Sequence, residues 1–172
     1  IITLISATVL VSFSGVGEAA AVNRGTREAA LAVREAQNAA LAVAEIRTTR
    51  GSMVARVAGI RFVRGSAQYV FFVDVNRNGR YDLPADASIW ERKFEGAAVV
   101  RQIAHYNYID GSGTRVPIPA AHVIFTAPEA SVSFRDVDGA ALGDVLEIEI
   151  SGPSGRTVKT ITIRASGQVS VR

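Results

Sequence analysis

The sequence predicts an α+β protein in which one long N-terminal helix, apolar in its first third, packs on an antiparallel, β-rich head. Three observations support this fold class. Residues 1–17 contain no charged side chain, and residues 18–49 are rich in Ala, Glu and Arg, with a single Gly and no Pro. After residue 51, short β-branched and aromatic runs alternate with turn residues. We therefore expect three segments, at residues 1–17, 18–50 and 51–172.

The first segment has the composition of a membrane-spanning or filament-core helix. At ~1.5 Å per residue, its seventeen residues would span about 25 Å, slightly less than the ~30 Å hydrocarbon core of a bilayer. We therefore expect a short membrane helix that a few residues before Ile1 would complete. The apolar side chains expected to drive assembly are Leu4, Ile5, Val9, Leu10, Val11 and Phe13.

The second segment continues the helix with an amphipathic pattern. Small apolar residues recur at intervals that are sums of three and four residues, which predicts one apolar stripe along the helix. The stripe consists of Val22, Ala29, Val33, Ala36, Ala40 and Val43. Because these side chains are small, we expect that neighbouring helices could approach closely.

The third segment predicts several short strands joined by tight turns, which is typical of an antiparallel sheet. The predicted strands are Tyr69–Val75, Ile89–Phe94, Val99–Tyr108, His122–Thr126, Val132–Phe134, Val145–Ile150 and Thr157–Arg164. The turns are expected at Asp110–Gly113, Asp138–Gly139 and Gly152–Gly155. Leu146, Ile148 and Ile150 alternate with more polar neighbours and are expected to face the core, as are Ile161 and Ile163.

Composition and motifs argue against an enzyme. The chain has no Cys, which excludes thiol catalysis, Cys-ligated zinc and disulfide staples. His105 and His122 are the two histidines, and the sequence has no H-E-x-x-H, G-x-S-x-G or P-loop motif. We therefore expect a binding or structural role.

One loop has the spacing of an EF-hand-like cation site. Oxygen-bearing side chains stand at relative positions 1, 3, 5 and 9, with glycine at position 6; they are Asp74, Asn76, Asn78 and Asp82. Ala85 occupies position 12, where an EF-hand carries a bidentate Glu, so a complete EF-hand is excluded, although Asp86 could close a looser site. Two interpretations stay open: an Asx-rich structural turn, which is favoured, and a weak site for a cation such as Ca²⁺. No other cofactor is expected.

A cationic stretch lies between Glu45 and Asp74, where the sequence has several arginines and no acidic residue. Arginine forms bidentate pairs with oxyanions, so this stretch is a candidate for anion or nucleic-acid contact. The candidate residues, with two from the C-terminal end, are Arg56, Arg61, Arg64, Arg164 and Arg172. A solvated connector that pairs with acidic neighbours is the favoured alternative.

The order of these parts resembles the type IV pilin and type II secretion pseudopilin superfamily, in particular its minor-pseudopilin branch. The resemblance rests on three stretches: the uncharged run and Ala-rich helix, the strand and loop of Tyr69–Asp82, and the segment from Val132 to the C-terminal hairpin. It implies a pilin-like fold. Members of this family carry an N-methylated residue followed four positions later by Glu, whereas no Glu occurs here before Glu18. Either Ser6 replaces that Glu or the mature chain begins several residues before Ile1, and we favour the second interpretation.

The resemblance implies a structural subunit of a type IV pilus or pseudopilus-like filament. Such a subunit is held in the bacterial inner membrane before assembly and then lies in an extracellular or periplasm-spanning fibre. Its partners would be copies of itself or other pilin-like subunits and the inner-membrane assembly machinery, with nucleic acid as a less favoured partner. The alternative is a low-copy minor subunit that primes assembly or acts as a receptor for DNA or a secreted substrate.

Overall fold

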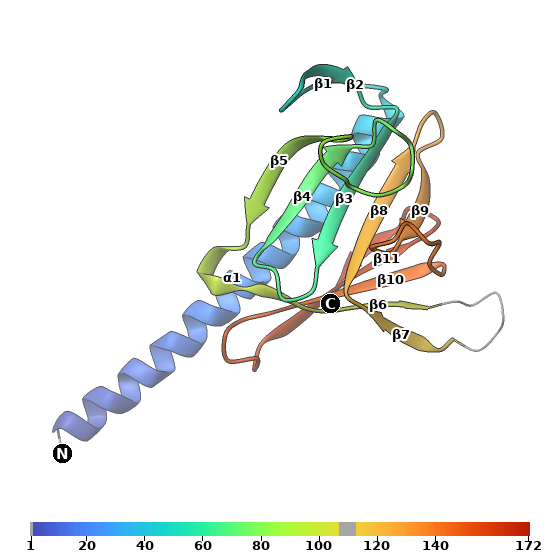
Figure 1. The fold of residues 1–172 in the computed structure, drawn as a ribbon. Coiled ribbons are helices and arrows are strands. Elements are labelled where there is room, and N and C mark those ends of the chain that lie inside the picture. Colours follow the sequence, from blue (N-terminus) through green and yellow to red (C-terminus); the bar gives the residue numbers. More distant parts are fainter. Residues whose placement is uncertain (1, 107–112) are drawn as a thin grey trace.

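The computed structural model describes the backbone of residues 2–106 and 113–172, and the side chains of residues 17–106 and 113–172. In these ranges the chain forms one α-helix, one 3-10 helix and twelve strands. Figure 1 shows the helix running behind a β-rich head and projecting from it toward the N-terminus.

The helix α1 (Ile2–Leu41) ends earlier than the sequence predicts. The backbone N–H of Val43 donates to the carbonyl of Ala40 at 3.1 Å, and the N–H of Ala44 donates to that of Ala39 at 3.0 Å. Together with a φ of 47° at Val43, these bonds form a Schellman motif. The motif satisfies the last helical carbonyls and turns the chain away from the helix axis.

The residues after this turn form a hairpin instead of a further helical turn. Strand β1 (Glu45–Thr48) pairs antiparallel with β2 (Gly51–Val54), with Ile46 opposite Met53. The β-branched side chains of Ile46 and Thr48 favour this extended backbone. The boundary predicted at residue 50, between the amphipathic helix and the β-rich head, therefore falls in the turn of a hairpin.

The predicted fold class is wrong in its balance of elements. Two five-stranded antiparallel sheets and the β1–β2 hairpin make up most of the regular secondary structure in the described residues, whereas the expected helix to about residue 49 stops at Leu41. The chain is thus mainly an antiparallel β-protein with one N-terminal helix. The physical reason is that the Schellman motif and cross-strand pairing outweigh the helix propensity of the Ala-rich stretch.

The first sheet has the strand order β5-β4-β3-β8-β9. Its strands are β3 (Val57–Val63), β4 (Gln68–Val73), β5 (Ala87–Lys93), β8 (Ala120–Thr126) and β9 (Ser131–Arg135). The central strand, β3, was not among the strands expected from the sequence. It pairs with β4 on one side and with β8 on the other.

The second sheet has the strand order β12-β11-β10-β6-β7. Its strands are β6 (Val99–Tyr106), β7 (Arg115–Ile118), β10 (Val145–Ser151), β11 (Val158–Arg164) and β12 (Val169–Val171), and a 3-10 helix η1 (Glu95–Ala97) precedes β6. The expected burial of Leu146, Ile148, Ile150, Ile161 and Ile163 is confirmed, because each has no exposed surface. The turn predicted at 110–113 and the strand end at 107–108 lie outside the described residues, apart from Gly113.

The main core lies where α1 packs against both sheets. The helix contacts β3, β4 and β8 of the first sheet and β10, β11 and β12 of the second. A smaller apolar cluster, which we call the outer cluster, consists of Val57, Phe72 and Ile124, with Tyr81 packed against it. The outer cluster lies on the first sheet beside the loop that follows β4, the loop with the predicted cation spacing.

Candidate functional site

The small-residue stripe of α1 is used within the molecule. Val22, Ala29 and Val33 are completely buried, as are Ala36 and Ala40. Close approach is essential here, because a Cβ atom on Gly25 would lie 3.1 Å from the ring of Phe94. The expectation that this stripe packs on a neighbouring helix is therefore replaced by packing on the chain's own sheets. Val43, the last stripe residue, lies beyond the helix and is 38% exposed.

The side chain of Glu18 joins the helix to the head. Its Oε1 atom accepts a hydrogen bond of 2.7 Å from the hydroxyl of Ser154. One turn and a half later, Arg24 forms an ion pair with Glu95 of η1. Together these contacts fix the direction in which the helix leaves the head (Figure 1).

The side chains proposed for assembly, Leu4, Ile5, Val9, Leu10, Val11 and Phe13, lie outside the residues whose side chains the structure describes. The backbone at these positions is helical. Within the described residues, no helix combines the length and the apolar character needed to cross a membrane.

The loop between β4 and β5 is organised by Asp74. Its Oδ1 atom accepts a hydrogen bond of 3.2 Å from the backbone N–H of Asn78, and its Oδ2 atom accepts one of 2.8 Å from Gly79. Asp74 is 3% exposed. Burial raises the pKa of this carboxyl, and the backbone N–H bonds act in the opposite direction. The carboxyl of Asp74 therefore serves the turn itself.

The other predicted cation ligands also bond within the loop. The side-chain amides of Asn76 and Asn78 donate to the two carboxylate oxygens of Asp82, at 3.2 and 3.1 Å. The side-chain oxygens of Asn76 and Asn78 in turn accept backbone N–H groups from Asn78 and Arg80. The structure thus brings all four predicted residues together, in bonds that suit an Asx-rich turn. In the described ranges, no group of three or more His, Asp or Glu side chains is placed to hold a metal ion.

Asp86, which the sequence offers as a residue that could close a looser cation site, closes this loop through hydrogen bonds. Asp86 has no exposed surface, and its two carboxylate oxygens accept the backbone N–H groups of Val75 and Asp82, each at 2.9 Å. Burial raises the pKa of Asp86 to about 6. The sequence signal was its place directly after Ala85, which stands at position 12 of the EF-hand-like spacing.

The predicted anion-contacting arginines do not form one surface. Arg56, Arg61 and Arg64 are spread along β3 and its ends, whereas Arg164 and Arg172 belong to the second sheet. The guanidinium of Arg61 lies 6.0 Å from the ring centroid of Tyr81. Arg172 bonds to Glu147 at 2.5 Å. We therefore regard this set as separate residues with different surroundings.

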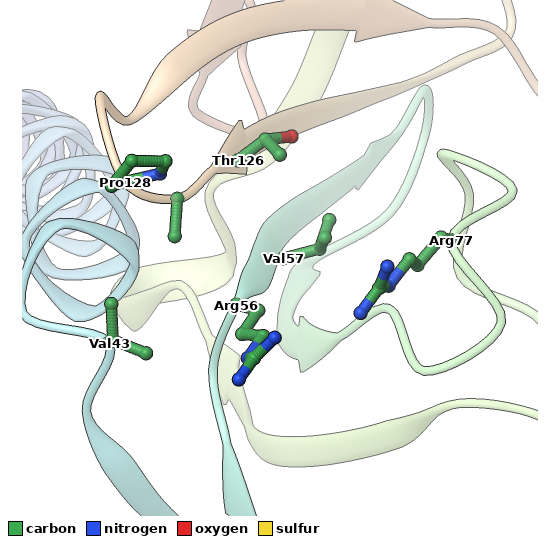
Figure 2. A pocket seen from close by; sticks show the side chains of 7 residues that line it. Val43, Arg56, Val57, Arg77, Thr126 and Pro128 are labelled. Atoms are coloured by element: carbon green, nitrogen blue, oxygen red, sulfur yellow. The ribbon is translucent and has the colours of Figure 1, made fainter.

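One of them, Arg56, lines a pocket with a residue that the sequence analysis did not single out. The pocket has a volume of about 350 Å³ and is lined by Val43, Arg56, Val57, Arg77, Thr126, Ala127 and Pro128. Figure 2 shows the side chains of Arg56 and Arg77 coming from different segments, with Val57 between them. Arg77 belongs to the loop organised by Asp74, so only the tertiary structure brings it to Arg56.

Comparison of the chain with protein-family models, with curated proteins and with solved structures yields no match. The resemblance to pilins and pseudopilins therefore rests on the residues of the sequence alone.

Proposed function

We propose that this protein is a structural subunit of a type IV pilus or pseudopilus-like filament and that it assembles through the first part of α1. The observation that carries this proposal is the position of the helix. Its uncharged first segment lies in the N-terminal part of α1, which projects from the head (Figure 1). This segment is the part of the chain best suited to bury its surface against other subunits.

Exposing this apolar helix surface to water would cost about 25 cal/mol per Å², so it has to stay covered, and close packing favours equivalent helices as its cover. In the membrane, lipid chains cover that surface, and in the fibre equivalent helices cover it. A subunit that repeats one head-to-tail contact without closing a ring forms a helical polymer. The head would lie on the outside of such a polymer.

The packing of the head supports this division of roles. The small-residue stripe of α1 is occupied by the two sheets, so it holds the helix to its own head. On another face of the helix, Leu31 is 64% exposed. This exposed leucine provides further surface for a neighbouring subunit.

A charge placed in the first segment tests the proposal in cells that make the protein. We expect Leu10→Asp to abolish sheared-off filaments while the head keeps its fold, because a carboxylate in an apolar helix bundle costs about 2.5–3.5 kcal/mol. The matched control is Leu83→Asp, since Leu83 is 68% exposed on the head. Normal filaments with Leu10→Asp, or equal loss with both variants, would refute assembly through this segment.

A second candidate, a low-copy minor subunit whose head recognises a ligand, is favoured by the pocket between Arg56 and Arg77. Mass spectrometry of sheared filaments distinguishes the two. A dominant fibre protein supports the structural subunit, and trace abundance supports the minor one.

A further inference from the structure

We propose that the head binds a carboxylate attached to an apolar group, in the pocket that Arg56 and Arg77 line. The carboxylate would lie between the two guanidinium groups, and its apolar part would rest on Val43, Val57 and Pro128. This inference concerns the head and does not depend on filament assembly.

Charge is the first argument. Within the described residues, no carboxylate forms an ion pair with Arg56 or Arg77, and no acidic residue lines the pocket. Asp74 lines an adjoining hollow together with both arginines, but its two oxygens accept the backbone N–H groups of Asn78 and Gly79. Two guanidinium groups without an ion-paired carboxylate favour an oxyanion, which arginine binds through paired N–H donors.

The lining of the pocket selects the kind of oxyanion. Apart from the arginines and Thr126, the lining residues are apolar, and Val57 is 7% exposed. A bare phosphate would leave that apolar surface in contact with water. A carboxylate on an aliphatic or aromatic body would cover it, as in ligand sites that combine apolar walls with a few polar groups.

Backbone hydrogen bonds hold the walls in place. The N–H of Ala127 donates to the carbonyl of Arg56 at 2.8 Å, and the N–H of Asp74 donates to the carbonyl of Val57 at 3.1 Å. The N–H of Ala55 donates to the carbonyl of Ala44 at 2.8 Å, which joins the chain beside Val43 to the chain beside Arg56. The site is thus formed before a ligand enters, which lowers the entropic cost of binding.

Backbone strain is the second, independent argument. Four non-glycine residues of the described chain have positive φ, and two of them, Val43 at 47° and Arg77 at 58°, line this pocket. Such a conformation is particularly unfavourable for a β-branched residue like Val43. Glycine would relax both positions but would remove the pocket's wall and one of its cations. The Schellman motif accounts for the φ of Val43 but not for a valine in place of glycine, and retained strain of this kind clusters at ligand and active sites.

Two adjoining hollows, of about 260 and 210 Å³, share Val57 and Arg77 with the pocket. A ligand longer than one small acid could therefore continue past Arg77. A free carboxylic acid and the end of a peptide chain have the same carboxylate chemistry, so the experiment includes both.

The experiment measures ligand binding to the full chain in detergent by titration calorimetry. The ligands are N-acetyl-leucine and an acetylated tetrapeptide that ends in Leu. The amidated form of each compound is the control ligand. We expect the free acids to bind, the amides not to bind, and binding to weaken as salt is added. Tighter binding of the peptide assigns the site to a chain end, and equal binding assigns it to a small acid.

Three variants test the residues. We expect Arg56→Gln and Arg77→Gln each to weaken binding about tenfold or more, because a charge-assisted hydrogen bond is worth about 1.5–3 kcal/mol. Arg64→Gln is the matched control, since Arg64 is exposed like Arg56 and Arg77 but lies outside the pocket. Circular dichroism confirms that each variant is folded. The proposal would be overturned if acid and amide bound equally, or if Arg64→Gln weakened binding as much as the other two variants. Binding of inorganic phosphate or DNA as tight as that of the acids would also overturn it.

Discussion

Asp86 accepts a hydrogen bond of 2.9 Å on its Oδ1 atom from the backbone N–H of Val75, eleven residues earlier in the chain. This bond joins the start of the β4–β5 loop to its end. The ring of Tyr81, in the middle of the loop, lies 5.1 Å from that of Phe72 in the outer cluster. The buried carboxyl therefore holds a loop that covers part of the first sheet.

Replacing this carboxyl should weaken the fold. Asp86→Asn places an N–H₂ group opposite one of two backbone N–H donors, so we expect a loss of about 1–3 kcal/mol in the free energy of unfolding. Urea denaturation at neutral pH measures it. Asp138→Asn is the control, since Asp138 is exposed in a turn, and it should change stability little. Equal stability of the two variants would contradict the role assigned to Asp86.

The dependence of stability on pH should reflect two buried groups with opposite signs. Burial raises the pKa of Asp86 from 3.8 to about 6, so its contribution is fully present below about pH 3.8 and is lost as pH rises through 6. Burial, with smaller effects from Arg61 and Arg80, lowers the pKa of His122 from 6.5 to about 4, although the backbone of Asp136 opposes this. The contribution of His122 is present above pH 6.5 and is lost as pH falls through 4.

Single variants separate these two contributions. Between the folded-state pKa of His122, about 4, and that of Asp86, about 6, we expect the free energy of unfolding to rise more steeply with pH in Asp86→Asn than in the unmodified protein. In His122→Gln it should instead fall more steeply with pH. Urea denaturation across this pH range checks both slopes, and slopes that match the unmodified protein would contradict the assignment.

Glycine at the end of α1 should stabilise the protein. Val43 occupies the C′ position of the Schellman motif with a φ of 47°, where a side chain costs roughly 1–2 kcal/mol. After the entropic cost of glycine, about 0.5–1 kcal/mol, we expect Val43→Gly to raise the free energy of unfolding by up to about 1 kcal/mol. Val54→Gly, on an exposed strand residue, should lower it. A loss of stability with Val43→Gly would show that its side-chain contacts outweigh the strain.

A methyl group at Gly59 should disturb the outer cluster. A Cβ atom there would lie 2.7 Å from the Cζ atom of Phe72 and 2.8 Å from the Cδ1 atom of Ile124. We expect Gly59→Ala to lower the free energy of unfolding by about 1–3 kcal/mol. Gly17→Ala is the control, because nothing lies within 4 Å of its added Cβ atom and alanine favours helix. Thermal unfolding of both variants measures the difference.

Calcium distinguishes the two interpretations of the β4–β5 loop. The oxygens of Asp74 and Asp82 already accept hydrogen bonds within the loop. We therefore expect the same Tm in millimolar calcium and in chelator. A higher Tm in calcium that disappears in Asp82→Asn would instead establish a cation site.

Much of the fold could be predicted because local pattern and burial agree. Ile148 and Ile161 alternate with polar neighbours and are fully buried, and His122–Thr126 lies within β8. Strand β3 was missed, because Gly59 and Arg61 interrupt its apolar pattern. In the folded chain Gly59 makes room for Phe72 and Ile124, which explains the interruption.

The candidate sites were less accessible from the sequence. The four oxygen-bearing residues of the β4–β5 loop were found because they lie close together in the chain. Asp86 was expected only as a residue that could close a looser cation site, whereas its buried carboxyl holds the loop through backbone N–H groups. The pairing of Arg56 with Arg77 in one pocket depends on the pairing of β3 with β4, which no local pattern reveals.

The sequence by itself determined the uncharged first segment, the positions of most strands and the turn-forming residues after β4, because these depend on composition and short spacing. Only the tertiary structure decided where α1 ends, which surface covers its small-residue stripe, and which arginine lies beside Arg56. These features depend on backbone hydrogen bonds and packing between segments far apart in the chain, such as the bond from Ala55 to Ala44 and the burial of Ala29 against the sheets. Local propensity is weaker than such contacts, so it yields to them wherever the two differ.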